Sequence, residues 1–119
     1  MKEIITQDLN YKVPKEGEYH IIYKYNNDKI YYEAYYLNGE YHRENNLPAY
    51  INYYENGKIN SEIYYLNGLR HRENNLPAII HYHDNGKIHY EYYYLNGKEY
   101  SKEDYIKQLR ILRIKQILE

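Results

Sequence analysis

Histidines at positions 81, 83 and 89 are the residues of this 119-residue chain with the clearest capacity for chemistry. Imidazole is a common ligand of zinc and other transition metals, and His81 and His83 share one face if they lie on a β-strand. In the strand register expected below, His89 lies on the opposite face. Their counterparts in the preceding copy of the same motif are Asn52, Tyr54 and Asn60, which are not typical zinc ligands. We therefore expect no metal site.

Residues suited to catalysis are sparse. The chain has no Cys, and Ser stands only at positions 61 and 101. It contains no Gly-rich phosphate loop and no spacing of histidine and carboxylate that is typical of a hydrolase. Ser61 beside a histidine is the one nucleophile that the pattern leaves open. We expect no catalytic residues, no bound cofactor and no enzymatic activity.

A His-Arg-Glu triplet occurs twice, within the identical segments 42–49 and 71–78. Residues that recur in a repeat first serve the repeat itself, so we expect the triplets to join neighbouring units by hydrogen bonds and partly shielded ion pairs. An exposed pair of this kind contributes about 0–1 kcal/mol. The functional alternative is a ladder of cationic groups for an acidic partner. The triplets are His42, Arg43 and Glu44, and His71, Arg72 and Glu73.

Both triplets belong to an internal repeat with a period of 29 residues. Residues 36–64 align with residues 65–93, and Leu-Asn-Gly occurs at 37–39, 66–68 and 95–97. A degenerate copy precedes them, with Asn-Asp-Lys-Ile at 27–30 in place of Asn-Gly-Lys-Ile. Terminal units of repeat arrays are commonly atypical. We predict one domain, with an N-terminal cap at 1–16, hairpin repeats at 17–100 and a helix at 101–119.

Two Asn-Gly turns per unit, flanked by strand formers, predict β-hairpins with type I′ turns, in which φ is positive at both central residues. Around Asn85-Gly86 this register pairs Asp84 with Lys87, His83 with Ile88, Tyr82 with His89, and His81 with Tyr90. Pro48 and Pro77 lack the N–H donor of a central strand and should lie at bends or edges. The chain is therefore predicted to be mainly β, a meandering antiparallel sheet of tandem hairpins with one C-terminal α-helix.

Alternation along the strands sorts the side chains onto two faces. The first carries Ile79, His81, His83, Ile88, Tyr90, Tyr92 and Tyr94. The second carries Ile80, Tyr82, Asp84, Lys87, His89, Glu91, Tyr93 and Leu95. The first is less charged and is assigned to the core, and the second is expected to face solvent with a row of Glu33, Glu62 and Glu91. Candidate protein-binding residues are Tyr35, Tyr53, Tyr64, Tyr82 and Tyr93.

The pattern changes at Ser101. Ser101 followed by Glu103 and Asp104 is typical of a capped helix start with acids in its first turn. Apolar residues then recur at helical spacing from Tyr105 to Leu118, with Lys and Arg between them. This predicts one amphipathic helix that either packs on the sheet or caps its open end.

The unit from Glu62 to Arg72, with its aromatic-x-Asn-Gly-x-x-His pattern, resembles the MORN-type repeat family. The likeness is closer to its divergent branch of antitoxin-like bacterial and giant-virus proteins, and it covers roughly residues 18–100. Tyr stands where Trp or Phe is often seen, and the period exceeds that of the shorter common unit. The resemblance implies an elongated sheet of stacked hairpins and a role in protein binding or, in some members, lipid contact. It implies no catalytic residues.

The composition of the chain disfavours several classes of function. The formal net charge is −1, so no overall field favours nucleic acid, and glutamates lie among the tyrosines whose rings can stack on bases. The absence of Cys fits a reducing compartment, and no apolar run is long enough for a transmembrane segment. Asn, Lys, Ile and Tyr, whose codons are AT-rich, form about half of the chain. We expect a cytoplasmic protein from an AT-rich genome, in the host-cell cytoplasm if it is viral.

Three functions remain. The first is a protein-interaction module that presents a Tyr-rich sheet face or an exposed edge to an unknown partner, since Tyr adds contact area at low entropic cost. The second is antitoxin-like neutralisation or sequestration of a small ligand in a pocket lined by His81 and tyrosines. The third is self-assembly through paired sheet edges.

Overall fold

Turns and strand formers alternate along the chain to give eleven strands and one helix in the computed structural model, which describes residues 1–119. The strands are β1 (Lys2–Thr6), β2 (Glu18–Lys24), β3 (Ile30–Leu37), β4 (Glu40–Tyr41), β5 (Tyr50–Tyr53), β6 (Ile59–Ile63), β7 (Tyr65–Leu66), β8 (Leu69–Arg70), β9 (Ile79–Tyr82), β10 (Ile88–Leu95) and β11 (Lys98–Tyr100). The helix is α1 (Lys102–Leu118). The predicted fold class, mainly β with one C-terminal helix, is confirmed.

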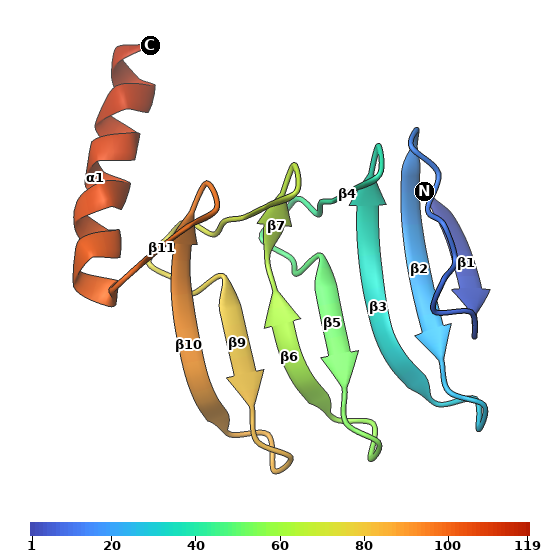
Figure 1. Ribbon diagram of the computed structural model, residues 1–119. Helices are drawn as coiled ribbons and strands as arrows, with labels where there is room; N and C mark the ends of the chain where they lie inside the picture. The colour runs from blue at the N-terminus through green and yellow to red at the C-terminus, as the bar shows by residue number, and fades with distance from the viewer.

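The strands line up in the order β1-β2-β3-β5-β6-β9-β10-β11, with β4 on β3 outside this path and β7-β8 as a separate ribbon (Figure 1). Every neighbouring pair from β2 to β10 is antiparallel, as predicted for a meander. β1 differs. It lies within the expected N-terminal cap and pairs with β2 in parallel, because residues 7–17 carry the chain back to the starting edge.

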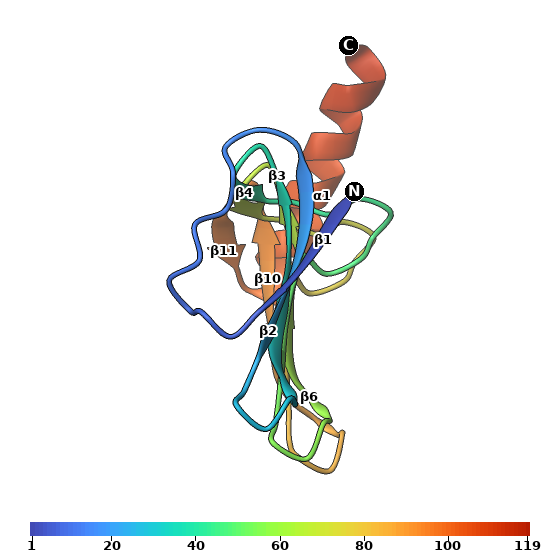
Figure 2. The ribbon, with the colours of Figure 1, turned by 90° about the vertical axis from the view of Figure 1, so that its right-hand side faces the viewer.

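The sheet has a single layer. Viewed along the sheet, the strands overlap in one narrow band (Figure 2), and the molecule measures 50 × 37 × 20 Å. Only 16 of the 119 residues are buried, so most strand residues remain partly exposed to solvent. Tyr suits such positions because its ring packs while its hydroxyl reaches water or a partner.

Two kinds of Asn-Gly turn alternate along the chain. At 38–39, 67–68 and 96–97 both residues have positive φ, which confirms the predicted type I′ turns. At 56–57 and 85–86 only the glycine does, so the type I′ prediction is wrong there. Instead, the His83 carbonyl accepts the Gly86 N–H at 2.9 Å and the His83 N–H donates to the Lys87 carbonyl at 2.8 Å. This is a longer turn with a glycine in the left-handed region.

That turn changes the register beside it. Tyr82 pairs with Ile88 rather than His89, and a bulge between Ile88 and Tyr90 then restores the predicted pairing of His81 with Tyr90. The predicted pairings of Asp84 with Lys87 and of His83 with Ile88 are wrong for the same reason. Equivalent bulges occur where β2 pairs with β3 and where β5 pairs with β6. In each unit the strand pairing is therefore shifted by one residue beside the turn, and the bulge restores the original register.

Cross-strand partners define two faces, which we name by their residues. The histidine face carries the row Tyr32, Asn52, Ser61, His81 and Tyr90. The glutamate face carries the row Glu33, Ile51, Glu62, Ile80 and Glu91. Because of the bulge, Ile88 lies with Tyr82 on the glutamate face, not on the face predicted for it.

The predicted division into a core face and a solvent face holds only in part: on the histidine face Ile21 and Ala34 are fully buried, as predicted for the core, but other residues contradict the division. On the glutamate face, Tyr64 is only 8% exposed and Ile80 9%, whereas Tyr90 and Tyr92 on the histidine face are 39% and 40% exposed. Loops protrude on both sides of the sheet in Figure 2. Residues 42–49 and 71–78 lie on the glutamate side, where Arg43 covers Tyr35, and β4 lies on the histidine side. Each face is thus covered in part.

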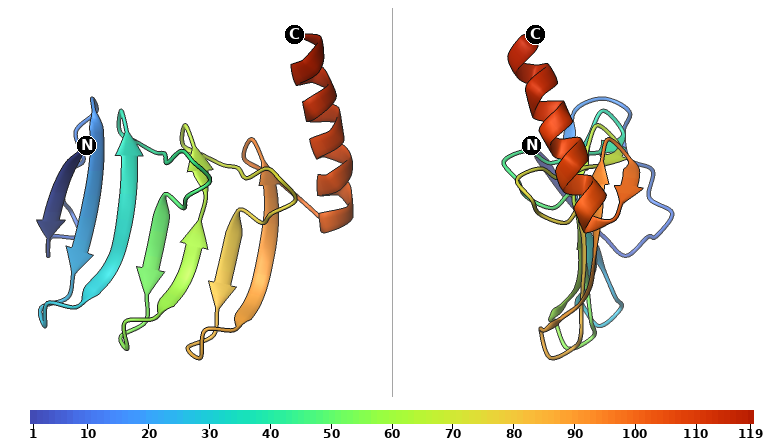
Figure 3. Two further views of the ribbon diagram at one scale, coloured as in Figure 1. Left: turned by 180° about the vertical axis from the view of Figure 1, so that it is seen from behind. Right: turned by 90° about the vertical axis from the view of Figure 1, so that its left-hand side faces the viewer.

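The helix caps the C-terminal end of the sheet. Its predicted start is confirmed: the Ser101 hydroxyl accepts the Asp104 N–H at 3.2 Å. Tyr105 and Leu109 are buried against Leu95, and the rest of α1 rises beyond the sheet instead of covering a face (Figure 3). Of the two predicted placements, the open end is the one observed. This helix is neither long nor apolar enough to cross a membrane.

Replacing Gly86 with Ala should lower the free energy of unfolding by about 1–2 kcal/mol, because φ is +87° there and an L-residue is strained in that region. An added Cβ would meet no atom within 4 Å, so the whole cost comes from the backbone. Urea denaturation followed by circular dichroism measures the change. Asp84→Ala, at an exposed position of the same turn, is the matched control. Equal unfolding midpoints for the two variants would contradict the turn assignment.

Candidate functional site

Tyrosine hydroxyls and carboxylates join neighbouring units across the glutamate face. Tyr53 donates to Glu33, and Tyr82, 29 residues later, donates to Glu62 at 2.5 Å. Burial raises the pKa of both tyrosines, and the hydrogen bond to a carboxylate raises it further. Both phenols therefore stay protonated as donors. Glu91 is the third member of the row and is exposed.

Arginines of the repeated triplets lie flat on tyrosines of the same face. The Arg43 Cζ is 3.7 Å from the centre of the Tyr35 ring, and the Arg72 Cζ is 3.7 Å from that of Tyr64. Both guanidinium groups also donate to a proline carbonyl five residues on, at 3.2 and 3.1 Å. Each arginine thus holds its crossover loop against the sheet.

The last unit replaces this arginine with an aromatic ring. Position 101, which follows Arg72 by one period, is Ser. The ring of Tyr105 instead packs on Tyr93 at a centroid distance of 5.0 Å, and its hydroxyl donates to the Arg72 carbonyl at 2.7 Å. The helix therefore fills the place that a further crossover loop would take.

Histidines of the triplets connect each unit to the next. The Nδ1 atoms of His42 and His71 accept the backbone N–H of Asn67 and Asn96, at 2.9 and 2.8 Å. On the other side of the ring, His71 Nε2 lies 2.8 Å from Glu73 and His42 Nε2 lies 3.9 Å from Glu44. All six triplet residues thus contact their own repeat or the next one.

The five candidate protein-binding tyrosines all lie on the glutamate face. Tyr64 is buried and the other four, Tyr35, Tyr53, Tyr82 and Tyr93, are half-buried. Their rings or hydroxyls already contact arginine, glutamate or the helix, as described above. The structure brings them together on one face, but not as a freely exposed row.

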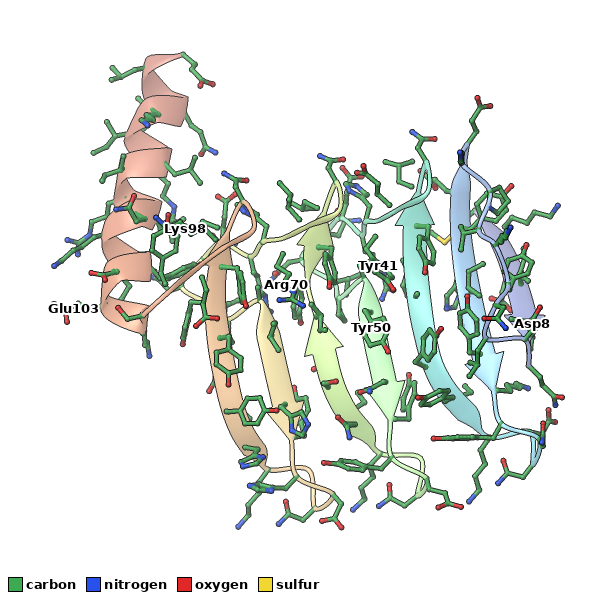
Figure 4. The ribbon with its side chains drawn as sticks, viewed as in Figure 1. Asp8, Tyr41, Tyr50, Arg70, Lys98 and Glu103 are labelled. Atoms are coloured by element: carbon green, nitrogen blue, oxygen red, sulfur yellow. The ribbon has the colours of Figure 1, made fainter.

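A second set of tyrosines, which the sequence did not single out, forms a series of stacked, tilted and edge-to-face rings on the histidine face, which we name the tyrosine stack. Ring centroids are 4.2 Å apart for Tyr23 and Tyr32, 5.1 Å for Tyr32 and Tyr50, 6.0 Å for Tyr50 and Tyr41, and 4.9 Å for Tyr41 and Tyr65. Tyr41 and Tyr50 lie near the middle of the sheet in Figure 4. Burial raises the pKa of Tyr50 to about 12. The stack extends from β2 to β7.

The three histidines cluster, contrary to the prediction that His89 lies apart. The rings of His83 and His89 stack at 4.1 Å, and those of His81 and His89 are 5.7 Å apart, because the bulge turns His89 to the histidine face. The rings stack instead of converging, and no group of three such ligands is arranged to hold a metal ion. Nδ1 of His81 is buried without a hydrogen-bond partner.

Neither the remaining nucleophile nor the largest hollow forms a catalytic arrangement. The Ser61 hydroxyl donates to the Asn52 side-chain oxygen at 2.5 Å, and an amide oxygen is not a general base. A groove of about 470 Å³ lies between the two crossover loops, lined by Arg43, His71 and Arg72 among others. These side chains already make the contacts described above.

Replacing Arg72 with Ala should lower the free energy of unfolding by about 1–3 kcal/mol, through loss of the ring stack and of the loop hydrogen bonds. Arg72→Lys should recover only part of this, because an ammonium cannot reproduce the planar fork of donors. Thermal and urea unfolding measure the change. Arg110→Ala, on the exposed side of α1, is the control. If both alanine variants lost equally little stability, Arg72 would not hold the loop.

Replacing His81 with Asn, the residue found at the equivalent position 52, should flatten the acid side of the stability profile. Burial, with smaller contributions from His89 and His83, lowers the pKa of His81 below its ordinary value of 6.5. The unfolded chain therefore binds this proton more readily, and stability falls as the pH drops below 6.5. Melting temperatures at about pH 7.5 and about pH 5.5 should differ more for the wild type than for the variant. Parallel profiles would rule out this role for His81.

Comparison with known proteins identifies no relative. No family model, curated protein or solved structure matches the chain. The proposal of a function below therefore rests on the surfaces of the molecule.

Proposed function

We propose that the chain is a non-enzymatic, cytoplasmic repeat scaffold that binds another protein through the histidine face. The supporting observation is the composition of that face: no Asp, Glu, Lys or Arg occurs in its rows from β2 to β10. Those rows contain Tyr19, Ile21, Tyr23, Tyr32, Ala34, Tyr36, Tyr50, Asn52, Ser61, Ile63, Ile79, His81, Tyr90 and Tyr92.

A Tyr-rich surface whose rows from β2 to β10 carry no charge suits protein binding for two physical reasons. The centres of protein interfaces are depleted of charged residues and enriched in aromatic ones. The stacked rings are also held by their neighbours, so little side-chain entropy is lost when a partner covers them. The resemblance of the turn motif to MORN-type repeats, which implies protein binding, supports the same proposal.

The other expected functions have weaker support. Sequestration of a small ligand was expected to need a pocket beside His81, whereas the 470 Å³ groove lies between the crossover loops. An antitoxin-like role is one form of protein binding and falls within the proposal. Nucleic acid is disfavoured because the rows of the exposed Tyr90 and Tyr92 carry no basic residue, and Arg70 on the same side already donates to the hydroxyls of Tyr65 and Tyr94.

Tyr92→Lys should reduce capture of the partner at least tenfold, because it places a charge in the neutral face at a position that is already 40% exposed. Tagged wild type and variant are used to capture proteins from the native cell lysate, with and without nuclease, and quantified by mass spectrometry. Ile114→Lys is the matched control, since Ile114 is 57% exposed on α1, outside the histidine face.

Equal melting temperatures of the two variants show that both are folded. Equal recovery by both variants would exclude the histidine face, and recovery only without nuclease would replace the protein partner with nucleic acid.

A further inference from the structure

β10 is the last strand of the repeated part of the sheet. In the earlier units the strand with the glutamate is followed by a further strand: Glu33 pairs with Ile51, and Glu62 with Ile80. The equivalent residue of β10 is Glu91. Residues 88–92 of β10 pair with β9 on one side, while β11 pairs only with Tyr93, Tyr94 and Leu95.

The outer edge of residues 88–92 is accessible. All five residues are exposed, and the helix rises from the other end of β10, so it leaves this half of the strand uncovered (Figures 1 and 3). The Tyr92 carbonyl accepts the Ala78 N–H at 2.8 Å, so the backbone of Tyr92 faces β9. Backbone groups alternate in direction along a strand. The N–H and C=O of Glu91 therefore point outward.

The internal units show which side chains such an edge accepts. In β5 and β9 the residue opposite the glutamate is Ile, and the tyrosine two positions later donates its hydroxyl to that glutamate. The two segments read Tyr-Ile-Asn-Tyr at 50–53 and Ile-Ile-His-Tyr at 79–82. Glu91 makes the same kind of acceptor available at the edge.

We propose that the outer edge of β10 binds an extended segment of a partner protein as an additional antiparallel strand. The segment carries an apolar residue, then Ile, any residue and Tyr, with the Ile opposite Glu91 and the Tyr hydroxyl donated to its carboxylate. Backbone hydrogen bonds supply affinity and the two side chains supply specificity. This deepens the proposed function by naming the chemistry of a partner, and it rests on that function.

A foreign strand fits this edge better than a second copy of the chain. Two β10 strands paired about Glu91 would place two carboxylates directly opposite each other, which is unfavourable. The other edge strand, β1, runs in the same direction as β9 and offers Ile4-Ile5-Thr6, but Gln7 stands where the tyrosine is needed. The Gln7 side chain already donates to the Tyr25 carbonyl at 3.4 Å.

The probe for the test is a fluorescent synthetic peptide with the sequence of residues 76–85, titrated into the full-length protein and followed by anisotropy. Saturable binding is expected. Glu91→Ala should weaken it about 2- to 10-fold, as should a peptide with Phe in place of its tyrosine. On Glu91→Ala protein the Phe peptide should bind no more weakly than the Tyr peptide, because both changes remove the same hydrogen bond.

Glu91→Pro tests the backbone contact. Its N–H points away from β9, so proline should spare the ladder with β9 and abolish peptide binding. Should that variant fail to fold, the double-mutant cycle alone decides. Absence of saturable binding to the wild type, or additive effects in the cycle, would overturn the proposal. Wild-type self-association that the peptide disrupts would also overturn it, in favour of a second copy. Capture of the partner from the lysate by Glu91→Pro separates the two surfaces, because Glu91 lies on the glutamate face. Full capture by this variant leaves a Tyr92→Lys effect to the histidine face, and lost capture assigns it to the edge.

Discussion

Hydrogen bonds and ring contacts between neighbouring units stabilise this protein beside two small buried clusters, because a sheet of one layer cannot bury a large continuous core. The bonds from Tyr53 to Glu33 and from Tyr82 to Glu62 bind each added strand to the strand before it. Arg43 and Arg72 then fasten the crossover loops over tyrosines of the same face. These contacts recur with the period of the sequence, so stability builds up unit by unit, as in other repeat proteins.

Much of the architecture could be predicted from the sequence because it depends on local rules. The period predicts the number and order of hairpins, and Ser101 predicts the start of the helix. Two of the five Asn-Gly turns could not be assigned, since Asn-Gly satisfies two geometries. Where Asn85 Oδ1 accepts the Lys87 N–H, the asparagine stays at negative φ and only the glycine enters the left-handed region. The same side-chain bond occurs at Asn27 and Asn56.

The candidate site was less predictable than the fold, because burial of charge depends on partners that alternation does not reveal. Because their face carries more charged residues, Glu33 and Glu62 were predicted to face solvent. In the structure the Glu33 side chain is only 15% exposed, since phenol and imidazole donors satisfy its oxygens. Alternation along the strands did not predict the tyrosine stack either, because its members Tyr41 and Tyr65 come from the short strands β4 and β7. The histidine cluster was missed because one bulge residue, His89, changes face.

The two edge strands of the sheet, β1 and β10, differ in how well they are protected against pairing with other chains. Exposed strand edges invite pairing with other chains, and proteins usually blunt them with charge, proline or a covering element. β1 places Lys2 and Glu3 at its edge, and α1 covers the upper part of β10 through Tyr105 and Leu109. The lower part of β10 has neither a proline nor a covering element, and its one charged side chain, Glu91, is equivalent to the glutamates that bind a tyrosine in both earlier units. The repeat thus ends on a surface with the same chemistry that joins its units internally.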